Sequence, residues 1–319
     1  MREIDNILMR AWETYRHNNE GAVADYIPEL GKASREDFGI AIASVGGDIR
    51  SIGMSAVEFT IQSISKVFSF CLALEVAGFE RVAACVGVEP SGDPFNAIIF
   101  DPSTNRPFNP MVNAGAITIA GLLHEALGAD AFNFILDRMS TAAGRQLTMN
   151  EKVFHSEDET GHRNRAIGHL LLATGTLVGR PDEALDVYFR QCSINVTAID
   201  LANMGATLAN MGENATTGRQ AFDIEAVRGT LAVMFTCGMY DYSGRWAYDV
   251  GIPAKSGVGG GILGVVNRQI GIATYAPPLD SRGNSVRGIA AFRMLSDEFG
   301  LHSFDWTNVG SSFISSVLR

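Results

Sequence analysis

The sequence is short of basic residues, and this limits what the protein can bind. It has 25 Lys and Arg against 35 Asp and Glu in 319 residues, a formal net charge of -10 at pH 7. No run of Lys or Arg interrupts this excess of acids. A nucleic acid needs a basic protein face that neutralises its phosphates. The composition therefore argues against nucleic acid as a partner.

Cysteine and long apolar stretches are also scarce. The four cysteines form no C-x-x-C pair and have apolar neighbours, so we expect buried thiols in a reducing compartment. The N-terminal residues include acids and lack the apolar core of a secretory signal. The longest apolar stretch that we identify, residues 167–179, is too short to span a bilayer. We therefore expect a cytoplasmic protein without membrane contact.

Motifs for cofactors and metals are absent or incomplete. No G-x-x-x-x-G-K-[ST] phosphate loop occurs. Residues 259–264 match G-x-G-x-x-G, but a strand pattern follows them instead of the helix that a dinucleotide site needs. His124 lacks the second histidine of a zinc-binding helix, and the three histidines between residues 155 and 169 are seven apart. We predict no cofactor and no metal.

What is present is a hydrophobic pattern that changes twice along the chain. Strand patterns lie near both ends, and the first two flank a hairpin turn at Gly46-Gly47-Asp48. We predict strands at residues 38–45, 49–53, 250–256, 261–267 and 270–276. Between them, apolar residues recur every three or four positions, which is typical of helices. We predict helices at residues 4–15, 67–76, 115–127, 131–139, 166–174, 182–191, 198–211, 225–234 and 287–299.

This order predicts an α+β fold made of two lobes. Strands from both ends of the chain pair most simply into one antiparallel sheet, with a helical insertion between them. We expect a discontinuous sheet lobe, flanked by helices, from residues 1–60 and 220–319. Residues 61–219 form the inserted all-α lobe. No linker separates the lobes, so the cleft between them is the expected site.

Ser63-x-x-Lys66 is the first pattern with chemical meaning. Residues three apart on a helix share a face, which would place the Lys66 amine beside the Ser63 hydroxyl. A serine needs such a base to act as a nucleophile, and burial can lower the pKa of a lysine enough for this role. The same pattern also occurs by chance, as a helix cap followed by a solvated lysine.

Lys255-Ser256-Gly257 is the second pattern, and it lies at the end of an apolar segment. In Ser-Lys acyl-transfer enzymes a K-[ST]-G strand flanks the nucleophile across the cleft. Gly257 would let the backbone approach a substrate, and the Val258 N–H could donate to an oxyanion. The plainer alternative is a flexible glycine turn. Both patterns in this order, with a helical insertion between them, are more specific than either alone.

Further motifs extend this pair to a known family. They are Asn109-Pro110-Met111-Val112-Asn113-Ala114-Gly115-Ala116, Ser156-Glu157 with Arg163-Asn164, Tyr188-Phe189 with Gln191-Cys192-Ser193, Met239-Tyr240-Asp241, and residues 253–258. With Gln62-Ser63-x-x-Lys66, the chain resembles the serine-dependent glutaminases from about residue 22 to 275. The resemblance is specific because many motifs agree in order and spacing. It implies a β-lactamase/transpeptidase-like fold, in agreement with the predicted lobes.

The resemblance implies a reaction, the hydrolysis of L-glutamine to L-glutamate and ammonia. Ser63 would attack the side-chain amide and form an acyl-enzyme, and Lys66 would accept the hydroxyl proton as the general base. Backbone N–H groups of Ser63 and Val258 would hold the oxyanion. Tyr26 and Tyr240 are the implied proton carriers near the leaving ammonia, and which of them serves which step stays open.

The resemblance also implies a set of substrate-binding residues. They are Gln62, Asn113, Glu157, Asn164, Tyr188, Tyr240 and Val258. Glu157 would meet the α-amino group, and Asn113, Asn164 and Tyr188 would donate to the α-carboxylate or share the two ends. On the sequence alone each of these four has a plainer explanation. The two asparagines would be caps or turns, the tyrosine a core aromatic, and Glu157 part of an acidic surface loop.

Some features leave other possibilities open. Ser193-Ile194-Asn195 matches the S-x-N motif of β-lactamases, but we give it little weight because Tyr188 is the family-matched residue nearby. A penicillin-recognising hydrolase of the same fold would need an export signal. A non-catalytic amino-acid-binding protein is disfavoured because Ser63 and Lys66 are both present. From the resemblance we expect a homo-oligomer, a dimer or a tetramer, without the ankyrin repeats of the family's longer members.

Overall fold

The computed structural model describes residues 2–94 and 96–305. Its longer helices are α1 (Arg2–Tyr15), α2 (Ser65–Val76), α3 (Phe79–Cys85), α4 (Asn113–Leu127), α5 (Ala131–Ala143), α6 (Glu151–Thr160), α7 (His162–Ala173), α8 (Pro181–Cys192), α9 (Ala198–Ala209), α10 (Ile224–Cys237), α11 (Ser243–Asp249) and α12 (Val286–Phe299). Short 3-10 helices are η1 (Leu30–Lys32), η2 (Gln62–Ile64), η3 (Gly128–Asp130) and η4 (Tyr240–Tyr242). The strands are β1 (Gly39–Ser44), β2 (Ile49–Gly53), β3 (Phe59–Thr60), β4 (Thr148–Met149), β5 (Ile194–Val196), β6 (Ala254–Ser256), β7 (Gly261–Val266) and β8 (Ile270–Tyr275).

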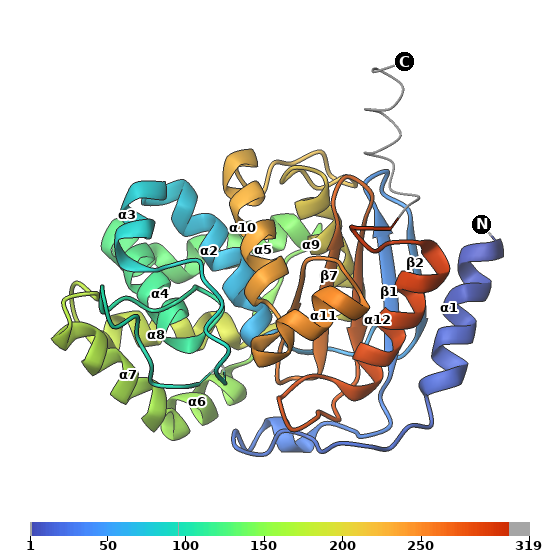
Figure 1. Cartoon of the computed structure of the whole chain (residues 1–319), viewed down its shortest axis with the longest axis horizontal. Coiled ribbons are helices and arrows are strands. Elements are labelled where there is room, and N and C mark those ends of the chain that lie inside the picture. Colours follow the sequence, from blue (N-terminus) through green and yellow to red (C-terminus); the bar gives the residue numbers. More distant parts are fainter. Residues whose placement is uncertain (1, 95, 306–319) are drawn as a thin grey trace.

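An antiparallel sheet of five strands, in the order β2-β1-β8-β7-β6, joins the two ends of the chain (Figure 1). β1 pairs with β8 so that Ile42 lies opposite Ile272 and Ala41 opposite Ala273. Successive residues of a strand point to opposite faces. The two isoleucines therefore enter one hydrophobic core and the two alanines the other. The predicted pairing of strands from both ends is confirmed.

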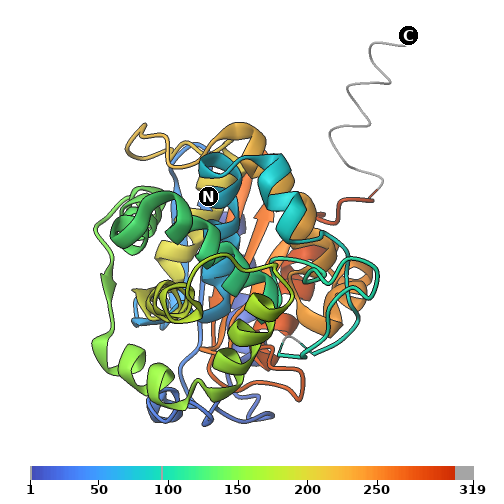
Figure 2. The ribbon, with the colours of Figure 1, turned by 90° about the vertical axis from the view of Figure 1, so that its left-hand side faces the viewer.

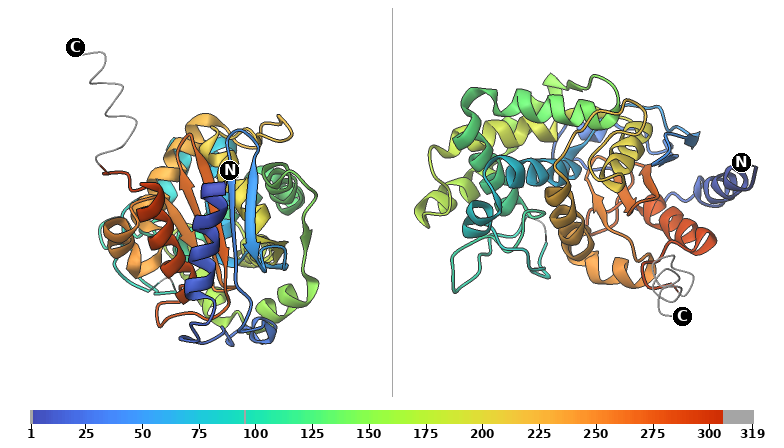
Figure 3. Two further views of the ribbon diagram at one scale, coloured as in Figure 1. Left: turned by 90° about the vertical axis from the view of Figure 1, so that its right-hand side faces the viewer. Right: turned by 90° about the horizontal axis from the view of Figure 1, so that it is seen from above.

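Helices cover both faces of this sheet. α1 and α12 lie side by side over one face (Figure 3, left). α9 packs against β1, β7 and β8 on the other face. This contact is close because glycines meet there. A Cβ on Gly271 of β8 would lie 2.2 Å from the backbone nitrogen of Ala206 in α9.

The other helices form a group beside the sheet, shown from its outer side in Figure 2. α4 lies within this group and packs against α2, α7 and α8. It buries an unbroken run from Asn113 to Leu123. The apolar periodicity of the middle of the chain thus forms the larger core.

One stretch among the described residues, 113–143, is long and apolar enough to cross a membrane by length and composition alone. It is longer than residues 167–179, the longest apolar stretch identified in the sequence. Within it, α4 ends at Leu127, and Gly128, with φ of +60°, begins η3, which leads into α5. The α4 part is packed inside the helical group.

A second, three-stranded sheet has the order β3-β5-β4. Phe59 of β3 pairs with Val196 of β5, and the Ile61 N–H then donates to the Ile194 carbonyl at 2.9 Å. The chain leaves this bond directly into η2, which carries Gln62 and Ser63. The small sheet therefore fixes the backbone just before the predicted nucleophile.

Most predicted elements are present, and the differences have local causes. The helix predicted at 198–211 ends at Ala209 because Met211 (φ +58°) and Gly212 (φ +90°) take left-handed backbone conformations. The strand predicted at 250–256 is reduced to β6, since Gly251 has φ of +69°. Three α-helices were not predicted, α3, α6 and α11, nor were the short strands β3, β4 and β5, of which β4 and β5 lie within the segment 61–219 that was expected to be all-α. The four free cysteines are buried, as expected.

The predicted division into lobes stays a prediction. α9 falls within residues 61–219 but packs on the main sheet. Residues 306–319 of the predicted sheet lobe lie outside the described residues.

Candidate active site

Ser63 and Lys66 meet at the junction of η2 and α2. Both are buried, with exposed fractions of 6% and 0%. Lys66 Nζ donates to Ser63 Oγ at 2.8 Å. Gln62, just before the serine, has φ of +49°, a conformation that costs energy for a residue other than glycine. The Ser-x-x-Lys spacing therefore gives the predicted contact, on a locally strained turn.

Lys66 is poised to lose its proton near neutral pH. Removal from water lowers its pKa from 10.5 to about 8. Its Nζ also donates to Asn113 Oδ1 at 2.7 Å and lies 5.7 Å from the centre of the Tyr188 ring. These contacts fix the amine beside the hydroxyl, the arrangement that a general base needs.

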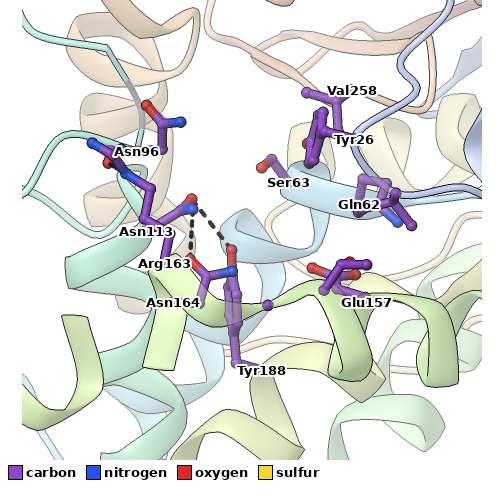
Figure 4. A pocket seen from close by; sticks show the side chains of 13 residues that line it. Tyr26, Gln62, Ser63, Asn96, Asn113, Glu157, Arg163, Asn164, Tyr188 and Val258 are labelled. Carbon is purple, nitrogen blue, oxygen red and sulfur yellow. Dashed lines mark hydrogen bonds between the residues drawn. The ribbon is translucent and has the colours of Figure 1, made fainter. Parts of the chain in front are cut away.

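Asn113, Asn164 and Tyr188 form a hydrogen-bonded chain leading away from Lys66 (Figure 4). Asn113 is the first residue of α4, and its Oδ1 also accepts from the Tyr188 hydroxyl at 3.3 Å. Its Nδ2 donates to Asn164 Oδ1 at 3.0 Å. The structure thus brings together three side chains that the sequence alone assigned to caps and a core aromatic.

Glu157 lies on helix α6 and is 5% exposed, so the sequence-based alternative of an acidic surface loop is wrong. Its Oε2 is buried and has no hydrogen-bond partner. Burial raises the pKa of this carboxyl from 4.5 to about 8, against the opposing effects of Lys66 and a hydrogen bond with Gln62. A buried carboxyl with an unpaired oxygen at a pocket can bind a cationic group of a ligand.

Tyr240 and the Lys255-Ser256 segment lie against Ser63 from the sheet side. Tyr240 is buried, has φ of +58°, and donates from its hydroxyl to the Ser256 carbonyl at 3.0 Å. Lys255 Nζ lies 4.0 Å from the centre of its ring and donates to the same carbonyl at 2.8 Å. Burial raises the pKa of Tyr240, and a hydrogen bond with Ser63 opposes this rise. Burial, aided by the charge of Lys66, lowers the pKa of Lys255 well below its usual value.

Val258 reaches the site on a tight turn. Gly257 N–H donates to the Gly261 carbonyl and Gly260 N–H to the Gly257 carbonyl, both at 3.0 Å. A Cβ on Gly257 would lie 2.9 Å from the Ile61 carbonyl oxygen, and one on Gly259 would lie 2.7 Å from that of Thr60. Only glycine allows this approach. The turn is followed by β7 and not by a helix, so the G-x-G-x-x-G match is no dinucleotide motif.

A pocket opens above Ser63, and most predicted site residues border it (Figure 4). It is lined by Tyr26, Ile27, Gln62, Ser63, Asn96, Asn113, Glu157, Thr160, Gly161, Arg163, Asn164, Tyr188 and Val258. Tyr26 is 55% exposed, so it contributes to the pocket while facing solvent. Lys66 and Tyr240 are buried and connect to the pocket through Ser63.

Five lining residues were not predicted: Ile27, Asn96, Thr160, Gly161 and Arg163. Arg163 stood in a recognised motif and Ile27 in the segment Ala24-Asp25-Tyr26-Ile27-Pro28, which also fits the family, whereas the other three carried no signal in the sequence. The S-x-N match is elsewhere, since Ser193 Oγ donates to the Phe189 carbonyl at 2.9 Å and Asn195 belongs to β5. Within residues 2–94 and 96–305, no group of three or more His, Cys, Asp or Glu side chains could hold a metal ion.

The sheet from both chain ends, the helical group and the Ser-Lys pair between them define a β-lactamase/transpeptidase-like fold. Solved structures agree. A probable glutaminase named YbaS is 39% identical, with a TM-score of 0.90 over 95% of this chain and 98% of the other. A probable glutaminase from Bacillus subtilis complexed with 6-diazo-5-oxo-L-norleucine is 37% identical, with a TM-score of 0.85 over 93% and 95%.

The sequence comparisons identify the family within this fold. A model of the glutaminase family matches residues 21–304. A glutaminase of Nostoc sp. is 50% identical over 93% of this chain and 89% of its own length. Glutaminase 1 of Bradyrhizobium diazoefficiens is 54% identical over 88% of this chain, which spans only 46% of that relative. The chain belongs to the glutaminase family, and the predicted resemblance is confirmed.

Proposed function

We propose that this chain hydrolyses L-glutamine to L-glutamate and ammonia through an acyl-enzyme on Ser63. One observation supports this most directly. Lys66 Nζ lies 2.8 Å from Ser63 Oγ at a pocket whose wall holds a buried carboxyl, Glu157, with an unpaired oxygen. Ser63 and Lys66 can act as a nucleophile and its base, and the Glu157 carboxylate can bind the α-ammonium group of a free amino acid.

The acylation step follows from these positions. Neutral Lys66 accepts the Ser63 proton as Oγ attacks the amide carbon of the substrate. Backbone N–H groups of Ser63 and Val258 stabilise the oxyanion that forms. As the C–N bond breaks, a proton passes to the leaving nitrogen, and ammonia departs. Tyr240 is the proton carrier that our proposal favours, because it shares a hydrogen bond with Ser63.

Deacylation repeats the sequence with water as the nucleophile. Water loses a proton to the base and attacks the ester carbon, and the same N–H groups hold the second oxyanion. The C–O bond to Ser63 then breaks, Oγ regains its proton, and glutamate is released. Using one base for both steps is consistent with the hydrogen bond from Lys66 to Ser63.

The remaining residues hold the substrate. Gln62 lines the pocket together with Glu157, and a hydrogen bond with Gln62 opposes the rise in the pKa of that carboxyl. Asn164 and Tyr188 lie on the pocket wall next to Asn113. Tyr26, exposed at the pocket, covers the bound substrate from the solvent side.

Ammonia release from L-glutamine by the purified protein tests this function. Ser63→Ala should remove it, and Ser51→Ala on the exposed edge strand β2 should retain it. If the wild-type protein releases no more ammonia than Ser63→Ala, the proposal fails. Mass spectrometry of the enzyme quenched with substrate should also show glutamyl mass added to the peptide that carries Ser63.

The two-lobe division, the cytoplasmic location and a dimer or tetramer complete the proposal. The family likeness supports the oligomer. Light scattering of the purified chain measures its mass directly, and a monomer at all concentrations would contradict this part.

A further inference from the structure

The amides near the expected α-carboxylate are already engaged with one another. Asn113 uses its Oδ1 for Lys66 and Tyr188 and one Nδ2 hydrogen for Asn164. Neutral amides alone also leave a full negative charge without a cationic partner. Lys66 cannot serve this end of the substrate, because it sits beside Ser63, where the side-chain amide must react.

Arg163 supplies a positive charge at this wall. Among the described residues that line the pocket, it is the only lysine or arginine. Its Nε donates to the backbone carbonyl of Asn96 at 2.6 Å. That bond fixes one edge of the planar guanidinium and occupies one of its five N–H groups. In Figure 4, Arg163 lies on the same side of the pocket as Asn96, Asn113 and Asn164, and Glu157 lies on the opposite side.

The ends of two helices add to the charge difference between the Arg163 side and the Glu157 side of the pocket. α6 ends at Thr160, α7 begins at His162, and Gly161 between them lines the pocket. A helix carries partial negative charge at its C-terminus and partial positive charge at its N-terminus. Gly161 permits the sharp corner, since a Cβ there would lie 2.6 Å from Cζ of Phe189. The negative helix end thus lies with Glu157 and the positive end with Arg163.

We propose that Arg163, together with the first turn of α7, binds the α-carboxylate of the substrate while Glu157 on α6 binds its α-ammonium group. The α6–α7 corner then recognises a zwitterion by opposite charges at its two ends. This inference rests on the proposed function and makes it more specific. Arg163 becomes the residue that restricts hydrolysis to γ-amides with a free α-carboxylate.

Two substrates and three variants test the role of Arg163. L-Glutamine carries the α-carboxylate, and 4-aminobutanamide is the same molecule without it. In Arg163→Gln, kcat/KM for glutamine should fall about 10- to 100-fold, mainly through KM, as expected when a hydrogen bond to a charged group is lost. For 4-aminobutanamide it should change less than about 3-fold, because the missing group makes no contact. Arg163→Lys should restore part of the loss.

Arg165→Gln is the matched control. Arg165 lies on the same helix and pairs with Asp158, but it does not line the pocket. Its loss removes the same charge and should leave the ratio of kcat/KM for L-glutamine to kcat/KM for 4-aminobutanamide unchanged. An unchanged KM for glutamine in Arg163→Gln, or an equal loss with both substrates, would overturn the inference.

A failure of the proposed function can be distinguished from a failure of the role assigned to Arg163. If wild-type protein releases no ammonia beyond Ser63→Ala, hydrolysis is excluded, and calorimetry then decides the inference from binding alone. Arg163→Gln should bind L-glutamine more weakly than wild type by the same 10- to 100-fold factor. Equal affinities would remove Arg163 from the site.

Discussion

Burial of Lys66 predicts how activity depends on pH. Its pKa is lowered from 10.5 to about 8. At pH 7 about one molecule in ten then carries the neutral amine, against about one in 3,000 for an unshifted lysine. Burial therefore raises the fraction of reactive base about 300-fold at that pH.

Glu157 adds a second titration in the free enzyme. Its pKa is raised to about 8, and the α-ammonium group of the substrate needs the ionised carboxylate. Both groups must lose a proton before productive binding, so log kcat/KM should rise with a slope near 2 below about pH 8. In the substrate complex the bound ammonium keeps Glu157 ionised. Log kcat should therefore rise with a slope near 1.

Initial rates of ammonia release between about pH 6 and 8.5 measure both slopes. In Glu157→Gln the slope of log kcat/KM should fall to about 1, since only Lys66 then titrates. Glu159→Gln, exposed on the same helix, is the control and should keep the wild-type profile. A wild-type kcat that does not change over this range would refute the assignment of Lys66 as the base.

Three further predictions concern stability. The folded pKa of Glu157 lies above its unfolded value of 4.5, so its stabilising contribution is complete below that value and is lost as pH rises through about 8. Calorimetry should show Tm falling more steeply between about pH 5 and 8, where the carboxyl is ionised only in the unfolded state, for wild type than for Glu157→Gln, and parallel curves would contradict this. Gly271→Ala should cost about 3 kcal/mol or more in urea unfolding, because its Cβ would meet the α9 backbone at 2.2 Å. Gly244→Ala, with no atom within 4 Å of the new Cβ, should cost nothing, and equal midpoints for the two would count against the close packing of α9. Thr197→Ala should cost about 1 kcal/mol by removing the capping box with Asp200 at the start of α9, and an unaltered unfolding midpoint would argue against that box.

The elements with regular patterns were predictable from the sequence. In β1, alternate residues enter different cores, so the period of two was visible. α4 and α8 carry apolar residues at helical spacing and were found within a few residues of their ends. The contact between Ser63 and Lys66 followed from their spacing of three. The family motifs then named the residues that share a pocket with them.

α6 could not be predicted because a charged residue occupies its inward face. Its buried residues are Val153, Phe154 and Glu157, so the carboxyl interrupts the apolar period that marks a helix. The left-handed backbone conformations of Gln62 and Tyr240 could not be predicted from the sequence either. A non-glycine residue holds such a conformation only when its tertiary surroundings impose it.

Arg163 illustrates the same limit for the site. Its place in a motif was plain, but its position on the pocket wall depends on the corner at Gly161 and on the Asn96 carbonyl, 67 residues away in sequence. Long-range contacts of this kind have no local signature in the sequence.

The backbone contact between the glycine turn and the segment before Ser63 separates two tasks in this protein. The segment before Ser63 and the turn that carries Val258 approach each other directly, since a Cβ on Gly257 would lie 2.9 Å from the Ile61 carbonyl oxygen. The residues to which the proposed function assigns the α-amino and α-carboxylate ends of the substrate come largely from α4, α6 and α7. Under the proposed function, changes at the α6–α7 corner should therefore alter which substrate is bound and leave the Ser63–Lys66 contact in place. An effort to redesign the substrate range should begin at this corner and leave the turn at 257–260 untouched.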